Sequence, residues 1–331
     1  MPGPVQASAA QYAELEATLL NTSGSIPLAR RFRALFALRN LKTHRAIDII
    51  GQGFNDSSAL LGHELAYVLG QINDIRALPV LESVLRDDNQ HPMVRHEAAE
   101  AMGAISSISS LPILEEYLNK PGEDVSVVET CEIAIAKIQF DHFTPSTSST
   151  QRSLYDSIDP APPKSMHDTD TNSDVEIQTL RVHLLDSTRS LFERYRAMFA
   201  LRNNASKEAV LALADGFKDA SALFRHEIAY IFGQLSSPHS VPSLLLVLQD
   251  EAESEMVRHE AAEALGSIAT DEVLPWLRQY ASKGPRVVRE SCEVALDMYE
   301  YEKSGELDYA EAIKGTPALP SSPLHFVEAT V

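Results

Sequence analysis

The stretch Met93-Val-Arg-His-Glu-Ala-Ala-Glu-Ala-Met-Gly103 returns later in the chain as Met256-Val-Arg-His-Glu-Ala-Ala-Glu-Ala-Leu-Gly266, with ten of eleven positions identical. A shorter His-Glu pair precedes each copy by 33 residues, at His63-Glu64 and at His226-Glu227. The chain therefore carries four His-Glu pairs, arranged as two pairs of pairs. Core packing does not select histidine and carboxylate together, so four matched positions indicate a polar site.

The whole chain is an internal duplication. Residues Arg33–Asn40 match Arg196–Asn203 at seven of eight positions, and Ser58–Gln71 match Ser221–Gln234 at nine of fourteen. These blocks share one offset of 163 residues with the opening stretch. Because repeats decide the fold, this symmetry is the first constraint on it.

Each half is itself repetitive. In the first half, similar helical segments begin near Leu28, Ser58, Pro92 and Asp124, roughly 30 to 35 residues apart. This spacing suits a helix–turn–helix repeat and is too short for a βαβ domain. Between them, apolar residues recur at three- and four-residue steps, as in residues 75–85, which predicts short amphipathic helices. Runs of alternating β-branched residues are absent. The sequence therefore predicts an all-α superhelix of stacked helical pairs, about four per half.

Composition divides the chain into four parts. Residues 142–175 are dominated by Ser, Thr, Pro and Asp, and such a segment cannot bury enough apolar surface to offset its ordering entropy. We expect a disordered linker there, between a first half at residues 1–141 and a second half at residues 176–314. The linker should tolerate shortening without loss of a site held between the halves. Residues 315–331, with three prolines, are expected to form a flexible tail.

Charge and cysteine content narrow the classes of function. The formal net charge of −19 disfavours a nucleic-acid partner and favours cations, namely metals, amines or a basic protein segment. Solubility alone is the plainer explanation of this charge. No run approaches 18 apolar residues and the N-terminus lacks signal-peptide features, so we expect neither a membrane span nor secretion. Only Cys131 and Cys292 are present, which favours a reducing compartment such as the cytoplasm.

Stacking brings equivalent repeat positions into one groove. One helix of each pair lines the concave face, and adjacent inner helices lie about 10 Å apart. His63 and His96 are equivalent positions, as are His226 and His259, so their imidazoles can converge, with the glutamates one position further round. A solvated surface pair would explain any one His-Glu dipeptide, but not four at a shared repeat position. The candidate metal ligands are His63, Glu64, His96, Glu97, His226, Glu227, His259 and Glu260.

The ligand types limit which metals can bind but do not identify one. Two imidazoles and one carboxylate form the facial arrangement used by non-haem iron, although zinc could also bind such a set. The doubling of the set is more informative. Two sites that face one another would hold two metals close enough to bridge one small ligand.

Four other side chains belong to the same helical faces. Tyr67 and Tyr230 follow His63 and His226 by four residues and could orient a ligand, or simply pack in the core. Glu100 and Glu263 could hydrogen-bond a metal ligand or line an acidic pocket.

The first and last repeats of each half carry different residues at the His-Glu position. Cys131 and Cys292, at an offset of 161, are best interpreted as small buried hydrophobes. Arg33 and Arg196 are expected to pair with inner carboxylates. Neither a glycine-rich phosphate loop nor a nucleophile–base–orienter set is present, so hydrolases and nucleotide enzymes fit poorly.

These motifs together resemble deoxyhypusine hydroxylases, which have four His-Glu motifs in two symmetric halves of HEAT-like repeats joined by a variable linker. The resemblance covers Leu28–Leu296 and includes Ser-x-Leu-x-x-His-Glu-x-Ala-Tyr and Val-Arg-His-Glu-Ala-Ala-Glu-Ala. No motif position departs from the family's pattern. The linker departs from it, and its length is similar to that of fungal members.

The resemblance implies a di-iron monooxygenase. It would use dioxygen and an external electron donor to hydroxylate the deoxyhypusine side chain of translation initiation factor 5A, forming hypusine, in the cytoplasm and also the nucleus. Glu64 and Glu227 could bind metal or instead hold the amines of the substrate. The implied ligand sets are His63, His96 and Glu97 for one Fe²⁺, and His226, His259 and Glu260 for the other.

Two other classes of protein compete with this interpretation. One is a HEAT-like scaffold that binds a protein and has no chemistry. The other is a pigment lyase of the related repeat family, which would not need paired His-Glu motifs in both halves. The iron content of the purified protein separates the hydroxylase from both.

Overall fold

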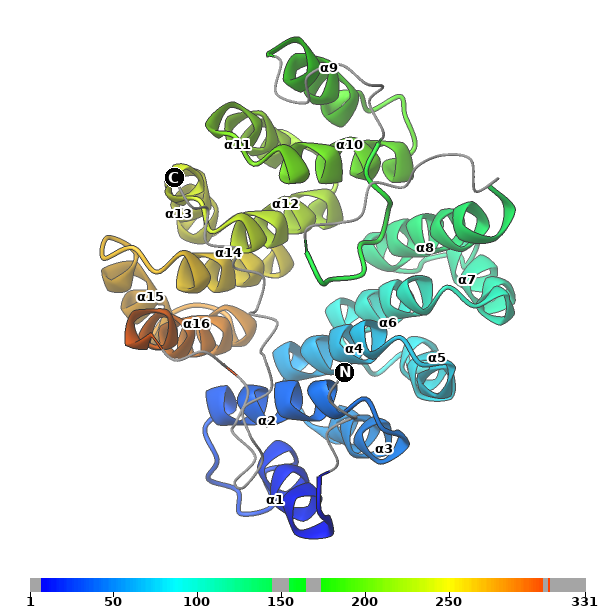
Figure 1. Ribbon diagram of the computed structural model, residues 1–331, viewed down its shortest axis with the longest axis vertical. Helices are drawn as coiled ribbons and strands as arrows, with labels where there is room; N and C mark the ends of the chain where they lie inside the picture. Colours follow the sequence, from blue (N-terminus) through cyan, green and yellow to red (C-terminus); the bar gives the residue numbers. More distant parts are fainter. Residues whose placement is uncertain (1–6, 145–154, 165–173, 306–308, 310–331) are drawn as a thin grey trace, which may run out of the picture.

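The computed structural model describes residues 7–144, 155–164, 174–305 and 309 (Figure 1). These residues form sixteen α-helices and five short 3-10 helices, and the described ranges contain no β-strand. None of these helices is long and apolar enough to span a bilayer. The predicted tail, residues 315–331, lies outside the described residues. The all-α prediction is confirmed.

The helices form four pairs in each half. In the first half they are α1 (Ala9–Leu19), α2 (Leu28–Leu41), α3 (His44–Gln52), α4 (Ala59–Ile72), α5 (Leu78–Arg86), α6 (Pro92–Ile105), α7 (Leu111–Leu118) and α8 (Val125–Phe143). In the second half they are α9 (Asp174–Leu185), α10 (Leu191–Asn204), α11 (Lys207–Ala214), α12 (Ala222–Leu235), α13 (Val241–Gln249), α14 (Glu255–Ile268), α15 (Leu274–Ala281) and α16 (Arg286–Ser304).

Local sequence signals account for where several of these helices start. The side chains of Ser58 and Asp124 each accept a hydrogen bond from a backbone N–H in the first turn of α4 and α8. This bond satisfies one of the N–H groups that a helix leaves unpaired at its start. Pro79 and Pro112 lie in the first turns of α5 and α7, where a missing N–H costs little.

The even-numbered helices form the inner layer and the odd-numbered helices the outer layer (Figure 1). Within each half, neighbouring even-numbered helices pack against one another. Helix α8 also packs against α10, and α16 against α2, so the superhelix closes into a ring. The even-numbered helices therefore surround a common centre, to which both halves contribute.

Reciprocal hydrogen bonds join the two halves. Ser58 Oγ at the start of α4 donates to Glu290 Oε2 of α16, and Ser221 Oγ at the start of α12 donates to Glu129 Oε2 of α8, each at 2.7 Å. These two bonds are related by the duplication. At the α2–α16 junction, Arg33 adds a bidentate ion pair with Asp297 at 2.9 and 3.0 Å.

Part of the predicted linker is ordered. Residues 155–164, called the strap below, pack across the junction between the halves, so the prediction of a disordered segment at 142–175 is wrong there. The main chain of Ile158 exchanges two hydrogen bonds with the Gln71 side chain, and Asp159 forms an ion pair with the buried Arg202. These specific partners compensate for the ordering entropy that average composition alone could not offset. The rest of the interhelical segment lies outside the described residues.

Candidate metal centre

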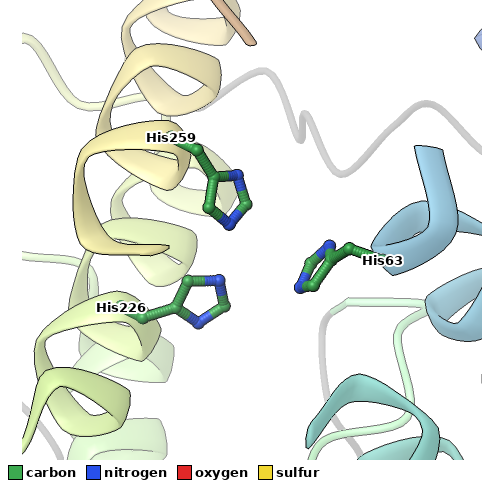
Figure 2. Close-up of side chains that lie close together, drawn as sticks. All are labelled: His63, His226 and His259. Carbon is green, nitrogen blue, oxygen red and sulfur yellow. The ribbon is translucent and has the colours of Figure 1, made fainter. Parts of the chain in front are cut away.

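Four histidines meet at the centre of the ring. His63, His96, His226 and His259 come from α4, α6, α12 and α14, and their exposed fractions are between 0% and 5%. Neighbouring ring centroids lie 5.0 to 5.6 Å apart. Figure 2 shows His63 reaching across the gap toward His226 and His259 of the other half. The predicted convergence within each half is present, and the two halves also converge on each other.

Two glutamates complete this cluster. Glu97 Oε2 lies 3.3 Å from His63 Nε2, and Glu260 Oε2 lies 3.4 Å from His226 Nε2. The second His-Glu motif of each half thus brings its carboxylate to the histidine of the first motif. One potential ligand atom from each of His63, His96 and Glu97 lies within 4.8 Å of the other two, and the same holds for one nitrogen from each of His63, His226 and His259.

A pocket of about 110 Å³ opens beside the histidines. Its lining includes Tyr67 and Tyr230, which confirms that they face the site, and Ile158 and Pro160 of the strap. Apolar side chains, including Phe36, line it as well. Six glutamates belong to the lining: Glu64, Glu97, Glu100, Glu227, Glu260 and Glu263.

Burial controls the protonation of the cluster. It lowers the pKa of His63 to about 4 and holds the pKa values of His96 and His259 well below their usual range. Neutral imidazoles keep a lone pair for a metal at neutral pH. Burial also raises the pKa of the Glu64 and Glu97 carboxyls to about 8.

Burial has the same effect on three further pocket carboxyls. Burial, together with neighbouring carboxylates, raises the pKa values of Glu100, Glu227 and Glu263 well above their usual range. So many buried acids are costly to ionise without cations. The pocket therefore favours a positively charged occupant.

The histidine nitrogens indicate what that occupant includes. Both ring nitrogens of all four histidines are buried and have no hydrogen-bond partner among the described residues. Most buried polar groups in proteins are paired, so this many orphaned nitrogens at one point require an explanation. Metal binding supplies one, because a neutral imidazole nitrogen is a common metal ligand. The donor set of imidazoles and carboxylates fits divalent iron or zinc.

The other candidates lie away from this chemistry. Cys131 and Cys292 are fully buried, and burial raises the pKa of both thiols to about 12, so they pack as small hydrophobes. Arg33 pairs with Asp297 and Arg196 with Glu193, both carboxylates of inner helices, as expected. Arg196 also donates to the strap.

Comparisons with known proteins agree with this architecture. Residues 47–130 and 210–297 match the family described as HEAT repeats. The deoxyhypusine hydroxylase of Candida albicans is 51% identical over 315 residues, covering 92% of this chain and 98% of the relative. That of Xenopus laevis is 57% identical over 287 residues, covering 87% of this chain and 91% of the relative.

This chain belongs to the deoxyhypusine hydroxylase family. A solved member, human deoxyhypusine hydroxylase in complex with glycerol, matches with a TM-score of 0.80 and 49% identity, covering 88% of this chain and 96% of the human one. Membership in the deoxyhypusine hydroxylase family confirms the resemblance carried by the four His-Glu motifs.

Sequence reasoning missed three features of the site. It did not anticipate the contact between His63 and His259 across the halves, which only ring closure brings about. It did not predict that residues of the strap line the pocket. It also assigned no role to Gln71 and Gln234, although their identical placement in the two copies was a usable signal.

Proposed function

We propose that this chain is an iron-dependent monooxygenase that hydroxylates the deoxyhypusine side chain of translation initiation factor 5A. One observation carries the proposal: four buried histidines with unpartnered nitrogens lie beside a pocket lined by six glutamates, in a chain of the deoxyhypusine hydroxylase family. Hydroxylation needs an oxidising centre and a place for the substrate, and the two parts of this site match those needs.

We assign the metal ligands by half. When bound, two Fe²⁺ ions would supply activation of dioxygen, with electrons from an external donor. The protein contributes neutral imidazoles and fixes them by burial between packed helices. The proposed sets are His63, His96 and Glu97 for one ion, and His226, His259 and Glu260 for the other.

The charge of the pocket favours a substrate with two ammonium groups. When cations fill the site and all six glutamates are ionised, they would carry six negative charges against four positive ones on two divalent ions, which leaves two negative charges uncompensated. The aminobutyl-lysine side chain carries two amino groups. A dication of this kind would therefore neutralise the site, and burial would make that pairing strong.

Glu64 and Glu227 are the proposed contacts for these amines. Glu227 is 2% exposed, and its Oε1 has no hydrogen-bond partner within the described part of the chain. Apolar pocket residues such as Phe32, Phe36 and Met298 can cover the methylene groups between the amines. The chain would thus hold a flexible aliphatic dication with its central carbons near the metals.

Iron content and turnover test the proposal together. The purified protein should hold two irons per chain and convert deoxyhypusine to hypusine in factor 5A. Glu64→Ala and Glu227→Ala should keep iron but bind substrate more weakly. A protein without iron, or one with iron but without turnover, would contradict the assignment. Loss of iron in Glu64→Ala would instead place Glu64 among the metal ligands.

A further inference from the structure

Two tyrosine hydroxyls meet in the pocket, one from each half. Tyr67 of α4 and Tyr230 of α12 lie one helical turn beyond His63 and His226, and their hydroxyl oxygens are 3.0 Å apart. Both residues line the pocket. A hydrogen bond between two hydroxyls can run in either direction, so its surroundings decide which phenol keeps a free O–H.

The second half fixes that direction. Arg202 Nη1 donates to Gln234 Oε1 at 2.9 Å, which assigns the oxygen of this amide and leaves Nε2 as the donor. Gln234 Nε2 donates to the Tyr230 hydroxyl at 3.0 Å and to Ser157 Oγ at 2.9 Å. Because the Tyr230 oxygen already accepts a hydrogen bond, donation of its own O–H to Tyr67 extends a cooperative chain. Tyr67 then has its O–H free for the pocket.

The strap anchors the start of this series of hydrogen bonds. Asp159 accepts two hydrogen bonds from Arg202, at 2.7 and 2.6 Å, and the Arg202 side chain is fully buried. Ser157 Oγ, which accepts from Gln234, also donates to Asp159 at 3.2 Å. Two strap residues therefore hold both the guanidinium and the amide in place.

Among the described residues, the first half has no equivalent anchor. Gln71 is the counterpart of Gln234. Its Oε1 accepts a hydrogen bond from the N–H of Ile158 at 2.8 Å, and its Nε2 donates to the carbonyl of Ile158 at 3.4 Å. Within the described part of the chain, Gln71 makes no hydrogen bond to Tyr67. The strap therefore breaks the two-fold symmetry of the pocket, and the free O–H is that of Tyr67.

We propose that Tyr67 is the hydrogen-bond donor for the oxygen atom that the reaction adds to the substrate chain, and that the strap sets the direction of this donor. This inference rests on the proposed function. The carboxylates of the pocket can accept the hydrogen of a new hydroxyl but cannot donate to its oxygen, so a neutral O–H group is suited to bind the lone pairs of that oxygen. Burial raises the pKa of both phenols, which keeps them protonated. Tyr67 is a binding contact, and Asp159, Arg202, Gln234 and Tyr230 are positioning residues.

A pair of small probes tests the contact without turnover. The probes are 1,4-diaminobutane and its 2-hydroxy derivative, titrated calorimetrically into the protein loaded with Fe²⁺ under anaerobic conditions. The hydroxy probe should bind about 2- to 10-fold more tightly, the range of one net hydrogen bond. Tyr67→Phe should reduce that ratio to about one. Tyr12→Phe is the matched control, because Tyr12 is also buried and bonds a hydroxyl, Thr43 Oγ1, far from the pocket.

The strap is tested by a double-mutant cycle. Asp159→Asn should lower the same probe ratio, and Asp159→Glu should restore part of it. Combined with Tyr67→Phe, Asp159→Asn should change the ratio no further, because both act on one donor. Ser157→Ala offers a milder version if Asp159→Asn does not fold.

The outcomes separate this inference from the proposed function. If Tyr67→Phe keeps the wild-type probe ratio, Tyr67 is not the donor and the inference is overturned, while wild-type turnover of deoxyhypusine still stands. If Asp159→Asn and Tyr67→Phe lower the ratio additively, the strap does not act through Tyr67. Loss of the ratio in Tyr67→Phe alone, with iron content unchanged, supports the contact.

Discussion

The two halves of the ring agree closely at the histidines and differ around them. His63 and Glu97 approach to 3.3 Å, and their counterparts His226 and Glu260 to 3.4 Å. Beyond this layer, Arg202 is fully buried against Asp159, whereas its counterpart Arg39 is only half-buried. The duplication has kept the proposed metal ligands and has diverged in the part of the pocket where, as proposed, one substrate would be held in one direction. A perfectly two-fold pocket could not distinguish the two ends of a chain.

The largest effect is expected from substitutions among the histidines, where the two halves agree. His96→Ala and His259→Ala should each abolish hydroxylation, although each touches the proposed ligand set of only one iron. Loss of groups that merely orient a ligand typically costs about 10- to 100-fold, and direct ligands should cost more. Turnover and iron per chain would be measured for both variants. Near-normal turnover in either one would end the di-iron interpretation.

The next effect concerns the two arginines that differ between the halves. Arg202→Ala leaves Asp159 buried without its partner and should lower the free energy of unfolding by about 3 to 5 kcal/mol. Arg39→Ala removes a half-buried side chain and should cost about 1 kcal/mol or less. Denaturant unfolding of the metal-free protein measures both. Equal losses would mean that the strap does not distinguish the halves.

Two matched glycines sharpen the comparison further. A Cβ at Gly70 would lie 2.9 Å from the Ala101 Cα, whereas one at Gly233 would lie 3.4 Å from the Ala264 Cα. Gly70→Ala must move backbone and should destabilise the protein by about 1 to 3 kcal/mol. Gly233→Ala fits and should stabilise its helix by about 0.5 to 1 kcal/mol. Thermal unfolding of the two variants should therefore shift in opposite directions.

The last expected effect is a pH dependence of metal affinity. Burial holds the pKa of Glu97, a proposed metal ligand, at about 8, so this carboxyl carries a proton below that pH and metal must displace it. Metal affinity should therefore rise up to about tenfold per pH unit for each displaced proton from pH 6 to 8, then level off. His63, with a pKa of about 4, is already neutral there. Calorimetry in buffers of different ionisation enthalpy would count the protons, and a pH-independent affinity would contradict the prediction.

Sequence predicted the fold because the fold is repetitive. Segments predicted to begin near Leu28, Ser58, Pro92 and Asp124 are α2, α4, α6 and α8, since capping residues and apolar periodicity are local signals. The convergence of the histidines also followed, because equivalent positions in stacked repeats must point into one groove.

The differences between the halves could not be predicted in this way. Gln71 and Gln234 are the same residue at the same repeat position, yet they bond different partners because a single strap crosses both. The strap lies within a segment whose average composition is typical of a disordered linker. Long-range contacts with Gln71, Arg202 and Gln234 order it, and no local pattern encodes those contacts.

The closing contacts of the ring have a consequence for folding. Open repeat arrays make only neighbour contacts, so they can nucleate anywhere and fray from either end. Here Ser58 bonds Glu290 and Arg33 bonds Asp297, across 232 and 264 residues of sequence. Contacts so distant in sequence form late, because a long loop must close before they stabilise anything. The first and last repeats therefore protect each other's ends, and we expect the ring to open as one cooperative unit rather than repeat by repeat.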